Sequence, residues 1–311
     1  MSNVMRRTFQ SFWPGRKGDR AASLSCRGDC ARVRGMETLP DSILQAHGLR
    51  AAQVAERSAL ATIWRVTRGD GSPAALKVYH GSDMANEAPG FALMQALDGH
   101  GAALVHSVGR TTALMEWLDG PSLGDMVRAG DDVTATAELA ATAARLHARA
   151  LPCDGLPVLA DWFAALFALQ FAPDCPAPAR RDIAAARALA RRLLDSQGPA
   201  RGLHGDLHHD NIRLCSRGYV AFDAKGVAGD IGYELANALR NPSGVPDLIR
   251  DPAVLRRRAS VWAPALGQTP DRLLQWGAAK CALSIAWRAG GTLACDRELD
   301  LLSILLGLGR A

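Results

Sequence analysis

The stretch Leu203–Asn211, LHGDLHHDN, places three histidines, two aspartates and an asparagine within nine positions, a density of polar residues that a protein core rarely needs. Asp206 and Asn211 stand five residues apart in the pattern HxDxxxxN. A predicted hairpin follows, and its second strand, Tyr219–Phe222, ends at Asp223. An aspartate, a loop, an asparagine, a hairpin and a second aspartate therefore form an ordered set.

These residue types suit the transfer of a phosphoryl group to a hydroxyl. Asp206 can accept or orient a hydroxyl proton, and Asn211 and Asp223 offer the hard oxygens that Mg²⁺ takes beside phosphate oxygens. Upstream, Lys77 offers a positive charge to the phosphates of a nucleotide, and Glu87 can hold that lysine by an ion pair. The five residues together predict a kinase-type site, whose cations stabilise the charge of the transition state.

The histidines permit a different interpretation, a zinc site. His204, His208 and His209 could ligate zinc, with Asp206 or Asp210 as a further ligand. The flanking glycines indicate a loop rather than a helix, and no second histidine-rich segment completes such a site. Histidines that brace the loop through hydrogen bonds are the simpler interpretation.

Other members of the set also have simpler interpretations when taken alone. Lys77 could be one solvent-facing lysine on an amphipathic strand, and Glu87 one acid favoured at a helix N-terminus. Asp223 could form a turn before Gly226. The order and spacing of all five residues favour the kinase-type site.

The chain changes from strand-like to helical patterns near its 118th residue. Strands at Ile63–Thr67 and Ala74–Tyr79 flank a glycine-bearing turn and predict a hairpin, with Lys77 on the face opposite Leu76 and Val78. Beyond this hairpin, a helix should run from near Glu87 to Leu97, and a buried strand should follow. The helices expected later in the chain lie at Asp132–Ala150, Asp161–Phe171, Ala179–Gln197 and beyond Tyr233.

Charge and composition restrict the classes of partner. Residues 1–36 carry eight Lys/Arg against Asp19 and Asp29, a net charge of +6, which leaves −1 of the chain's +5 for the remainder. We expect this segment to be a disordered basic tail, and translation could also begin at Met36. The near-neutral remainder gives no support for nucleic-acid binding.

The sequence also gives no sign of a membrane span or of a paired-cysteine motif. No apolar run approaches the roughly 18 residues of a membrane span, and the seven cysteines contain no CxxC pair. We expect reduced thiols in a cytoplasmic protein.

Three stretches carry a resemblance to a known family: RGLHGDLHHDNI, SRGYVAFDAKGVAGDIGYELAN and CALSIAWRAGG. The chain resembles the aminoglycoside phosphotransferases, and within them the streptomycin 6-phosphotransferase and hydroxyurea-kinase group, from about Leu39 to near Gly291. The resemblance implies an α+β, two-lobed protein-kinase-like fold. Its small β-rich N-lobe would span residues 37–118, and its larger helical C-lobe, residues 119–311.

The resemblance also implies roles for individual residues. ATP would bind between the lobes, with Asp206 as the catalytic aspartate. Asn211 and Asp223 would bind Mg²⁺, and Lys77 with Glu87 would form the phosphate-side pair. The backbone of Glu116 and Leu118 would contact adenine.

Two departures from the protein-kinase pattern stand out. Ser58–Thr62, at the position of the glycine-rich phosphate loop, contains no glycine, although the hydroxyls of Ser58 and Thr62 can still donate hydrogen bonds. Asp223 is followed by Ala-Lys-Gly rather than Phe-Gly.

The implied activity is that of a streptomycin 6-phosphotransferase conferring antibiotic resistance, acting as a monomer or weak dimer on a small-molecule acceptor. Streptomycin is a dication, so we expect an acidic acceptor site, for which Asp210, Asp230 and Glu234 are the candidates; a solvated acidic face is the alternative. Trp287 could wall that site or belong to the core. The rival interpretations are a kinase for hydroxyurea or another metabolite, and a pseudokinase that binds nucleotide without transfer.

Overall fold

The computed structural model describes residues 38–309, which form two compact units. One unit, here called the β unit, comprises residues 38–85 and 105–117, and the other, the helical unit, comprises residues 86–104 and 118–309. The predicted basic tail lies outside the described residues. Within the described part of the chain, no helix is both long enough and apolar enough to cross a membrane.

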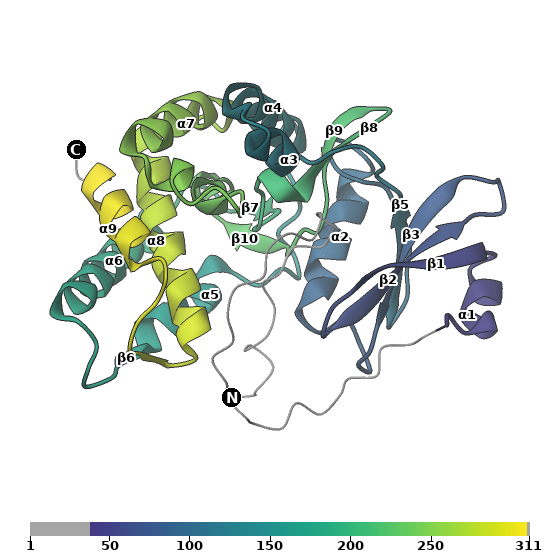
Figure 1. The fold of residues 1–311 in the computed structure, drawn as a ribbon, viewed down its shortest axis with the longest axis horizontal. Coiled ribbons are helices and arrows are strands. Elements are labelled where there is room, and N and C mark those ends of the chain that lie inside the picture. Colours follow the sequence, from purple (N-terminus) through teal and green to yellow (C-terminus); the bar gives the residue numbers. More distant parts are fainter. Residues whose placement is uncertain (1–37, 310–311) are drawn as a thin grey trace. The chain divides into compact units, whose positions relative to one another are not determined.

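The β unit is a five-stranded antiparallel sheet with the strand order β1-β2-β3-β5-β4 (Figure 1). Its elements are α1 (Asp41–Ala46), β1 (Arg50–Arg57), β2 (Ala61–Thr67), β3 (Pro73–Tyr79), β4 (Val105–Val108) and β5 (Thr112–Glu116). The predicted hairpin corresponds to β2 and β3, and the amide of Ser72 donates to Asp70 in the turn between them. Trp64, Leu76 and Leu114 belong to its buried core, on which α1 packs.

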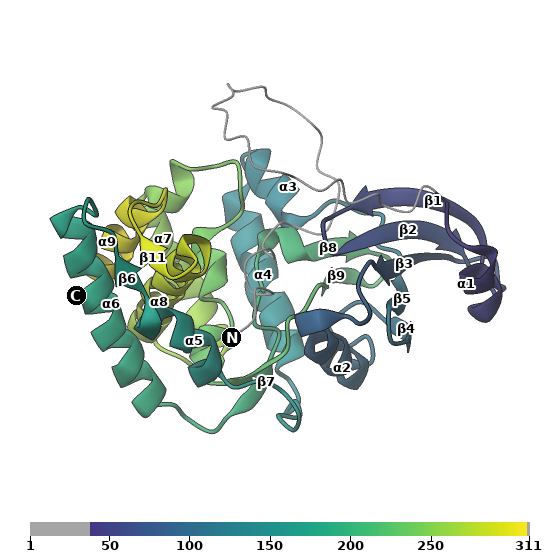
Figure 2. The ribbon, with the colours of Figure 1, turned by 90° about the horizontal axis from the view of Figure 1, so that it is seen from below.

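The helical unit is built around α8 (Pro270–Ala289), which contacts α5, α6, α7 and α9 (Figure 2). Apolar or small residues cover most of its surface, as expected of a helix that lies inside a core. The other α-helices are α2 (Ala88–Leu97), α3 (Leu123–Arg128), α4 (Asp132–Leu146), α5 (Leu159–Ala168), α6 (Ala177–Asp195), α7 (Pro252–Ala265) and α9 (Leu299–Leu308).

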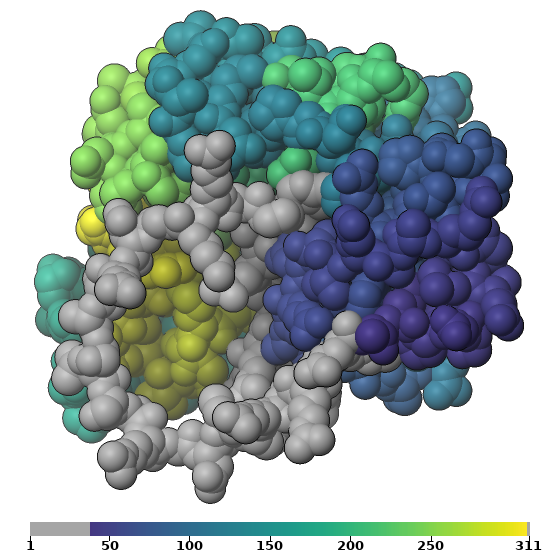
Figure 3. Space-filling model, turned by 45° about the vertical axis from the view of Figure 1, so that its right-hand side comes forward, coloured from purple at the N-terminus to yellow at the C-terminus, as the bar shows by residue number. Residues whose placement is uncertain are grey.

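Short ladders and turns hold the segments that carry the predicted site. Strand β7 (Arg201–Leu203) pairs with β10 (Val227–Gly229), and β8 (Ile212–Cys215) forms the predicted hairpin with β9 (Gly218–Ala221). Figure 3 shows that hairpin beside α3 and α4 on the surface of the helical unit, in agreement with their contacts. The 3-10 turns are η2 (Ala85–Glu87), η3 (His209–Asn211), η4 (Ile231–Tyr233), η5 (Asn237–Arg240) and η6 (Leu248–Arg250).

The predicted elements are found, but several of their ends differ. The helix predicted to reach Ala150 ends at Leu146. The helix predicted to reach Phe171 ends at Ala168, because Gln170–Phe171 leave the helix and form a parallel ladder, β6, with β11 (Thr292–Leu293). After Tyr233 the chain makes separate 3-10 turns before α7, since Pro242, Gly244 and Pro246 interrupt any continuous helix. Residues 86–104, placed in the predicted N-lobe, pack within the helical unit.

Candidate active site

Two hydrogen bonds of the His204 ring fix the loop that carries Asp206. The ring Nε2 of His204 lies 3.0 Å from the carbonyl oxygen of Phe222, and the Asp206 amide donates to Nδ1 of the same ring at 3.3 Å. The two contacts together define a neutral ring with its proton on Nε2. Burial lowers the pKa of His204, which keeps the ring neutral. His204 therefore braces the loop, as the simpler interpretation of the histidines predicted.

The other two histidines also have structural contacts. Nδ1 of His208 accepts from the Asp210 amide at 3.2 Å and caps η3. His209 is fully buried with its ring centroid 5.7 Å from that of Trp262, and this burial lowers its pKa well below the usual value. Within residues 38–309, no group of three or more His, Cys, Asp or Glu side chains is arranged to hold a metal ion.

Asn211 presents an oxygen suited to a cation. Its Nδ2 donates to the backbone oxygen of Asp206 at 3.0 Å, which fixes the amide. Its Oδ1 is buried and, within the described part of the chain, accepts no hydrogen bond. A buried acceptor left without a donor costs about 1–3 kcal/mol. A hard cation held jointly by one or two side chains and by phosphates would satisfy that oxygen, so the Asn211 amide fits the predicted Mg²⁺ ligand.

Asp223 is held in an uncommon backbone conformation. Its φ is +59°, a left-handed value that Asp, Asn and Gly adopt more readily than other residues. Its Oδ2 lies 3.1 Å from Nζ of Lys225, which also lies 3.5 Å from Oε1 of Glu87. A close approach of two backbones makes this arrangement possible, since a Cβ on Gly90 of α2 would lie 1.8 Å from the Ala224 oxygen. Strain of this kind is common at functional sites.

Lys225 links the two carboxylates electrostatically. Burial alone would lower the pKa of its ammonium, but the charges of Asp223 and Glu87 raise it above the usual value. Lys225 therefore carries a positive charge at every physiological pH. The sequence pattern paired Glu87 with Lys77 instead. Those two residues belong to different units, so their pairing stays a prediction.

The β unit carries most of the residues that the sequence predicts to bind the nucleotide. Lys77 is buried on β3, opposite Ala113 of β5, with Nζ 5.3 Å from the centroid of the Tyr79 ring. Ser58 lies in the β1–β2 turn, where its Oγ accepts from the amide of Ala61 at 3.1 Å. Glu116 is the last residue of β5, and the buried Leu118 begins the next segment of the helical unit.

The three acidic candidates for the acceptor site all have protein partners. Asp210 accepts from Nη1 of Arg128 at 2.8 Å and from the Ser243 amide at 3.3 Å. The buried Glu234 accepts from the His204 amide at 3.1 Å, and its other oxygen lies 3.6 Å from Nε2 of His147. These contacts give both carboxylates structural roles, and their contact with an acceptor stays a prediction.

Asp230 has the most complete set of contacts among the three. Its Oδ1 accepts from the Gly232 amide at 2.7 Å and caps η4. Its Oδ2 forms an ion pair with Arg272 of α8 and also accepts from the Gly198 amide at 3.4 Å. The side chain is 4% exposed. Asp230 therefore ties η4 to α8 and to the chain after α6.

Replacing Asp230 by asparagine should destabilise the fold. The new side chain can still cap η4 through its oxygen, but Arg272 loses its charged partner. We expect a loss of about 1–3 kcal/mol in the free energy of unfolding, below the value for a fully buried pair because Arg272 is 24% exposed. Urea denaturation measures the free energy of unfolding. Asp271→Asn is the control, because Asp271 is an exposed residue of α8, the helix that carries Arg272. Unchanged stability together with a raised KM for the acceptor would instead make Asp230 an acceptor ligand.

The structure adds a residue that no sequence pattern singled out. Nδ2 of Asn237, in η5, donates to Oδ1 of Asp206 at 2.7 Å, and both side chains are buried. Lys225 was visible in the Asp-Ala-Lys-Gly string, where a cation follows Asp223 by two positions. Asn237 ends the second stretch that carries the family resemblance, but no spacing pattern links it to Asp206, because 31 residues separate the two.

Trp287 lies at the edge of the core rather than within it. It is half-buried near the end of α8, and its ring centroid lies 5.8 Å from that of Trp162. Nζ of Lys280 stands 4.4 Å from the Trp287 ring, a cation–π contact. Burial lowers the pKa of Lys280 to about 7.

The protein contains an aspartate on an ordered loop, a second aspartate after a hairpin, and an asparagine whose oxygen accepts no hydrogen bond within residues 38–309. These features fit a phosphotransferase with the protein-kinase-like fold. Solved structures with this fold resemble the chain. A choline/ethanolamine kinase family protein from Mesorhizobium loti matches with a TM-score of 0.60 and 13% identity, over 86% of this chain and 95% of that one. A thermostable mutant of aminoglycoside phosphotransferase APH(4)-Ia, in a ternary complex with ADP and hygromycin B, matches with a TM-score of 0.55 and 14% identity, over 87% of this chain and 96% of that one.

Sequence comparison identifies the family. The family model for aminoglycoside/hydroxyurea antibiotic resistance kinases matches residues 48–291, so the chain belongs to that family. A streptomycin 3''-kinase from Klebsiella pneumoniae is 37% identical over 232 residues, 72% of this chain and 83% of the relative. A hydroxyurea phosphotransferase from Kitasatospora aureofaciens is 30% identical over 299 residues, 90% and 82%.

Proposed function

We propose that this kinase transfers the γ-phosphoryl group of ATP to a hydroxyl of streptomycin. The observation that supports this most directly is the geometry around Asp206. Its carboxylate is buried and held by Asn237 at Oδ1, while Asn211 beside it offers an oxygen without a donor in the described residues. One group is thus fixed for a hydroxyl and the other is available for a cation.

In the proposed reaction the acceptor oxygen attacks the γ-phosphorus, and the bond to the bridging oxygen of ADP breaks. Asp206 orients the acceptor hydroxyl and takes its proton on Oδ2. Mg²⁺, held by Asn211 and Asp223, would neutralise charge on the phosphate oxygens. We assign Lys77 and Glu87 to the phosphate side of the nucleotide, and the backbone of Glu116 and Leu118 to adenine, as the resemblance implies.

For the position of the phosphorylated hydroxyl, the resemblance and one relative point to different oxygens. The resemblance favoured the 6-hydroxyl, whereas the relative at 37% identity is named a 3''-kinase. We adopt the 3''-hydroxyl on the strength of that relative. The presence of Asp206, Asn211, Asp223 and Lys77 together argues against a pseudokinase.

Hydroxyurea is the second candidate acceptor, and two observations favour it. The hydroxyurea phosphotransferase relative aligns over 90% of this chain. In addition, Asp210, Asp230 and Glu234 are all engaged by protein partners, which leaves these three carboxylates less available to a dication. A neutral acceptor needs no such carboxylate.

Purified enzyme with ATP and Mg²⁺ should phosphorylate streptomycin at least tenfold more efficiently, in kcat/KM, than hydroxyurea or a neutral sugar. Because the acceptor must reach Asp206, omission of streptomycin should leave only slow ATP hydrolysis. Two-dimensional NMR of the product locates the phosphate. Phosphate on the 6-hydroxyl would overturn the 3'' assignment alone, whereas turnover of hydroxyurea without turnover of streptomycin would overturn the proposed acceptor.

A further inference from the structure

The carboxylate of Asp206 is held asymmetrically. Its Oδ1 accepts a hydrogen bond of 2.7 Å from Nδ2 of Asn237. Its Oδ2 receives, from the described part of the chain, only the amide of Asn211 at 3.5 Å, a length at which a hydrogen bond is weak. Oδ1 is thus committed to the protein, and Oδ2 is the oxygen available to a hydroxyl.

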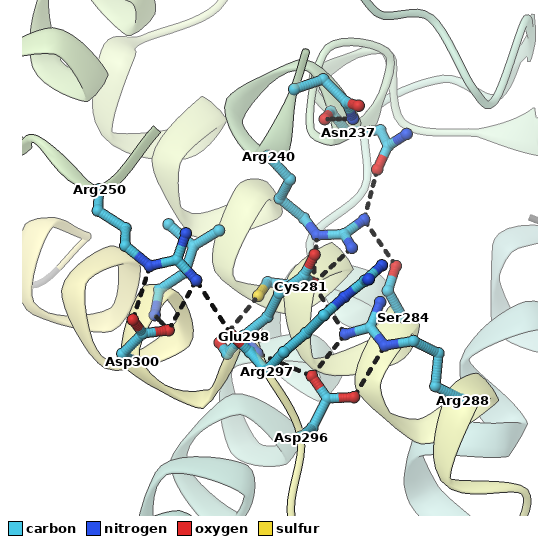
Figure 4. A network of polar contacts seen from close by, with 12 residues as sticks. Asn237, Arg240, Arg250, Cys281, Ser284, Arg288, Asp296, Arg297, Glu298 and Asp300 are labelled. Carbon is cyan, nitrogen blue, oxygen red and sulfur yellow. Dashed lines mark hydrogen bonds and ion pairs between the residues drawn. The ribbon is translucent and has the colours of Figure 1, made fainter. Parts of the chain in front are cut away.

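The orientation of the Asn237 amide is itself determined by a neighbour. Nη1 of Arg240 donates to Oδ1 of Asn237 at 2.6 Å. A guanidinium has donors only, so the amide must point its oxygen at Arg240 and its nitrogen at Asp206. The same Nη1 lies 2.9 Å from Oγ of Ser284 on α8 (Figure 4).

Arg240 is in turn fixed by an ion-pair network on the segment before α9 (Figure 4). Glu298 accepts from Nε and Nη2 of Arg240 at 3.1 and 2.5 Å. Arg288 lies 2.8 Å from Glu298 and 2.7 Å from Asp296. Burial alone would raise the pKa of Glu298, but the two guanidiniums hold it below its usual value, so Glu298 stays charged.

The chain of contacts runs without a break from Glu298 through Arg240 and Asn237 to Asp206. Each link is a hydrogen bond to a charged group, and such bonds are shorter and about twice as strong as those between neutral groups. The amide places a neutral donor, rather than a cation, against the carboxylate. It therefore fixes the rotation of the carboxylate without neutralising it.

We propose that Asn237 is a positioning residue that turns Oδ2 of Asp206 toward the acceptor hydroxyl, and that Arg240 and Glu298 act through Asn237. This proposal rests on the proposed function, since it takes Asp206 as the group that orients the hydroxyl. A misplacement of about 1 Å at a reacting group can cost about 100-fold in rate. The effect of losing Asn237 should therefore appear in kcat.

The sharpest variant is Asn237→Asp. It keeps the shape of the side chain and its contact with Arg240, but places an oxygen where the amide nitrogen donated to Asp206. We expect kcat to fall by about 100-fold, while the KM values for ATP and acceptor stay within about threefold of wild type. Normal stoichiometry of Mg-ATP binding by calorimetry shows that the variant is folded. A wild-type kcat in Asn237→Asp would overturn the proposal.

A double-mutant cycle tests the role of Arg240. Arg240→Ala should lower kcat by about tenfold, and it should lower kcat no further once Asn237→Ala is present, because residues that act through one another are not additive. Arg250→Ala is the matched control, since Arg250 pairs with Asp300 at 2.6 Å and does not contact Asn237. Its kcat should remain within twofold of wild type. If the losses of kcat in Arg240→Ala and Asn237→Ala are additive in the double variant, then Arg240 does not act through Asn237.

A crystal structure of the Asn237→Ala variant separates this proposal from the proposed function. The Asp206 carboxylate should be rotated or occupy two conformations. A single, unchanged conformation would overturn the positioning role even if no acceptor were found. A wild-type enzyme that phosphorylates no acceptor, together with a rotated Asp206 in the variant, would overturn the proposed function and leave the positioning role supported.

Discussion

Replacing Asp206 by asparagine should abolish most phosphate transfer while leaving nucleotide binding intact. The substitution keeps the shape of the side chain but removes the carboxylate that we propose orients the acceptor hydroxyl and takes its proton. General-base groups contribute about 10²–10⁴-fold to rate, and we expect kcat to fall by that factor. The Kd for Mg-ATP should stay within about threefold, because Asn211 and Asp223 are unchanged.

Steady-state kinetics with streptomycin and calorimetry with Mg-ATP measure the two quantities separately. Asp195→Asn, the same chemical change at an exposed position near the end of α6, is the control and should keep wild-type kcat. If Asp206→Asn loses Mg-ATP affinity as strongly as it loses kcat, then Asp206 belongs to the metal site rather than to the acceptor side.

The part of the site that the sequence predicts well is local in the chain. Asp206 and Asn211 are five residues apart, and a single loop closed by a 3-10 turn brings the Asn211 amide to the Asp206 carbonyl. Asp223 follows one short hairpin later. Spacing and turn chemistry alone bring such residues together, so the pattern HxDxxxxN predicts that Asp206 and Asn211 lie close together, while their roles stay a prediction.

The contacts that the sequence did not predict join segments far apart in the chain. Arg240 and Glu298 are 58 residues apart, and they meet only because the segment before α9 packs beside η5. Arg272 reaches Asp230 across 42 residues. The sequence suggested Asp230 as an acceptor ligand because it lies a short distance along the chain from Asp223. The packing of α8 pairs its carboxylate with Arg272, and its contact with an acceptor stays a prediction. Periodicity reports which face of a helix is buried and not which polar groups meet there.

Replacing Asp223 by asparagine should also cause a large loss of activity, and this loss should depend on the concentration of Mg²⁺. Asp223→Asn keeps a residue type that tolerates the φ of +59°, but removes one carboxylate charge from the proposed Mg²⁺ site and from Lys225. Loss of a charge-stabilising group at a reacting centre costs about 10²–10³-fold, and we expect kcat/KM to fall by that factor. The Mg²⁺ concentration for half-maximal activity should rise, and so should the Kd for Mg-ATP.

Asp223→Ala distinguishes the role of the carboxylate from that of the backbone. Alanine should cause the same change in Mg²⁺ dependence, but it also has to adopt a left-handed conformation that costs about 1–3 kcal/mol. The alanine variant should therefore unfold at a lower urea concentration than the asparagine variant, while the two have similar kinetics. A wild-type Mg²⁺ activation curve in Asp223→Asn would remove Asp223 from the metal site. A wild-type curve in both variants, with a stability loss in Asp223→Ala alone, would leave Asp223 a purely structural role in this loop.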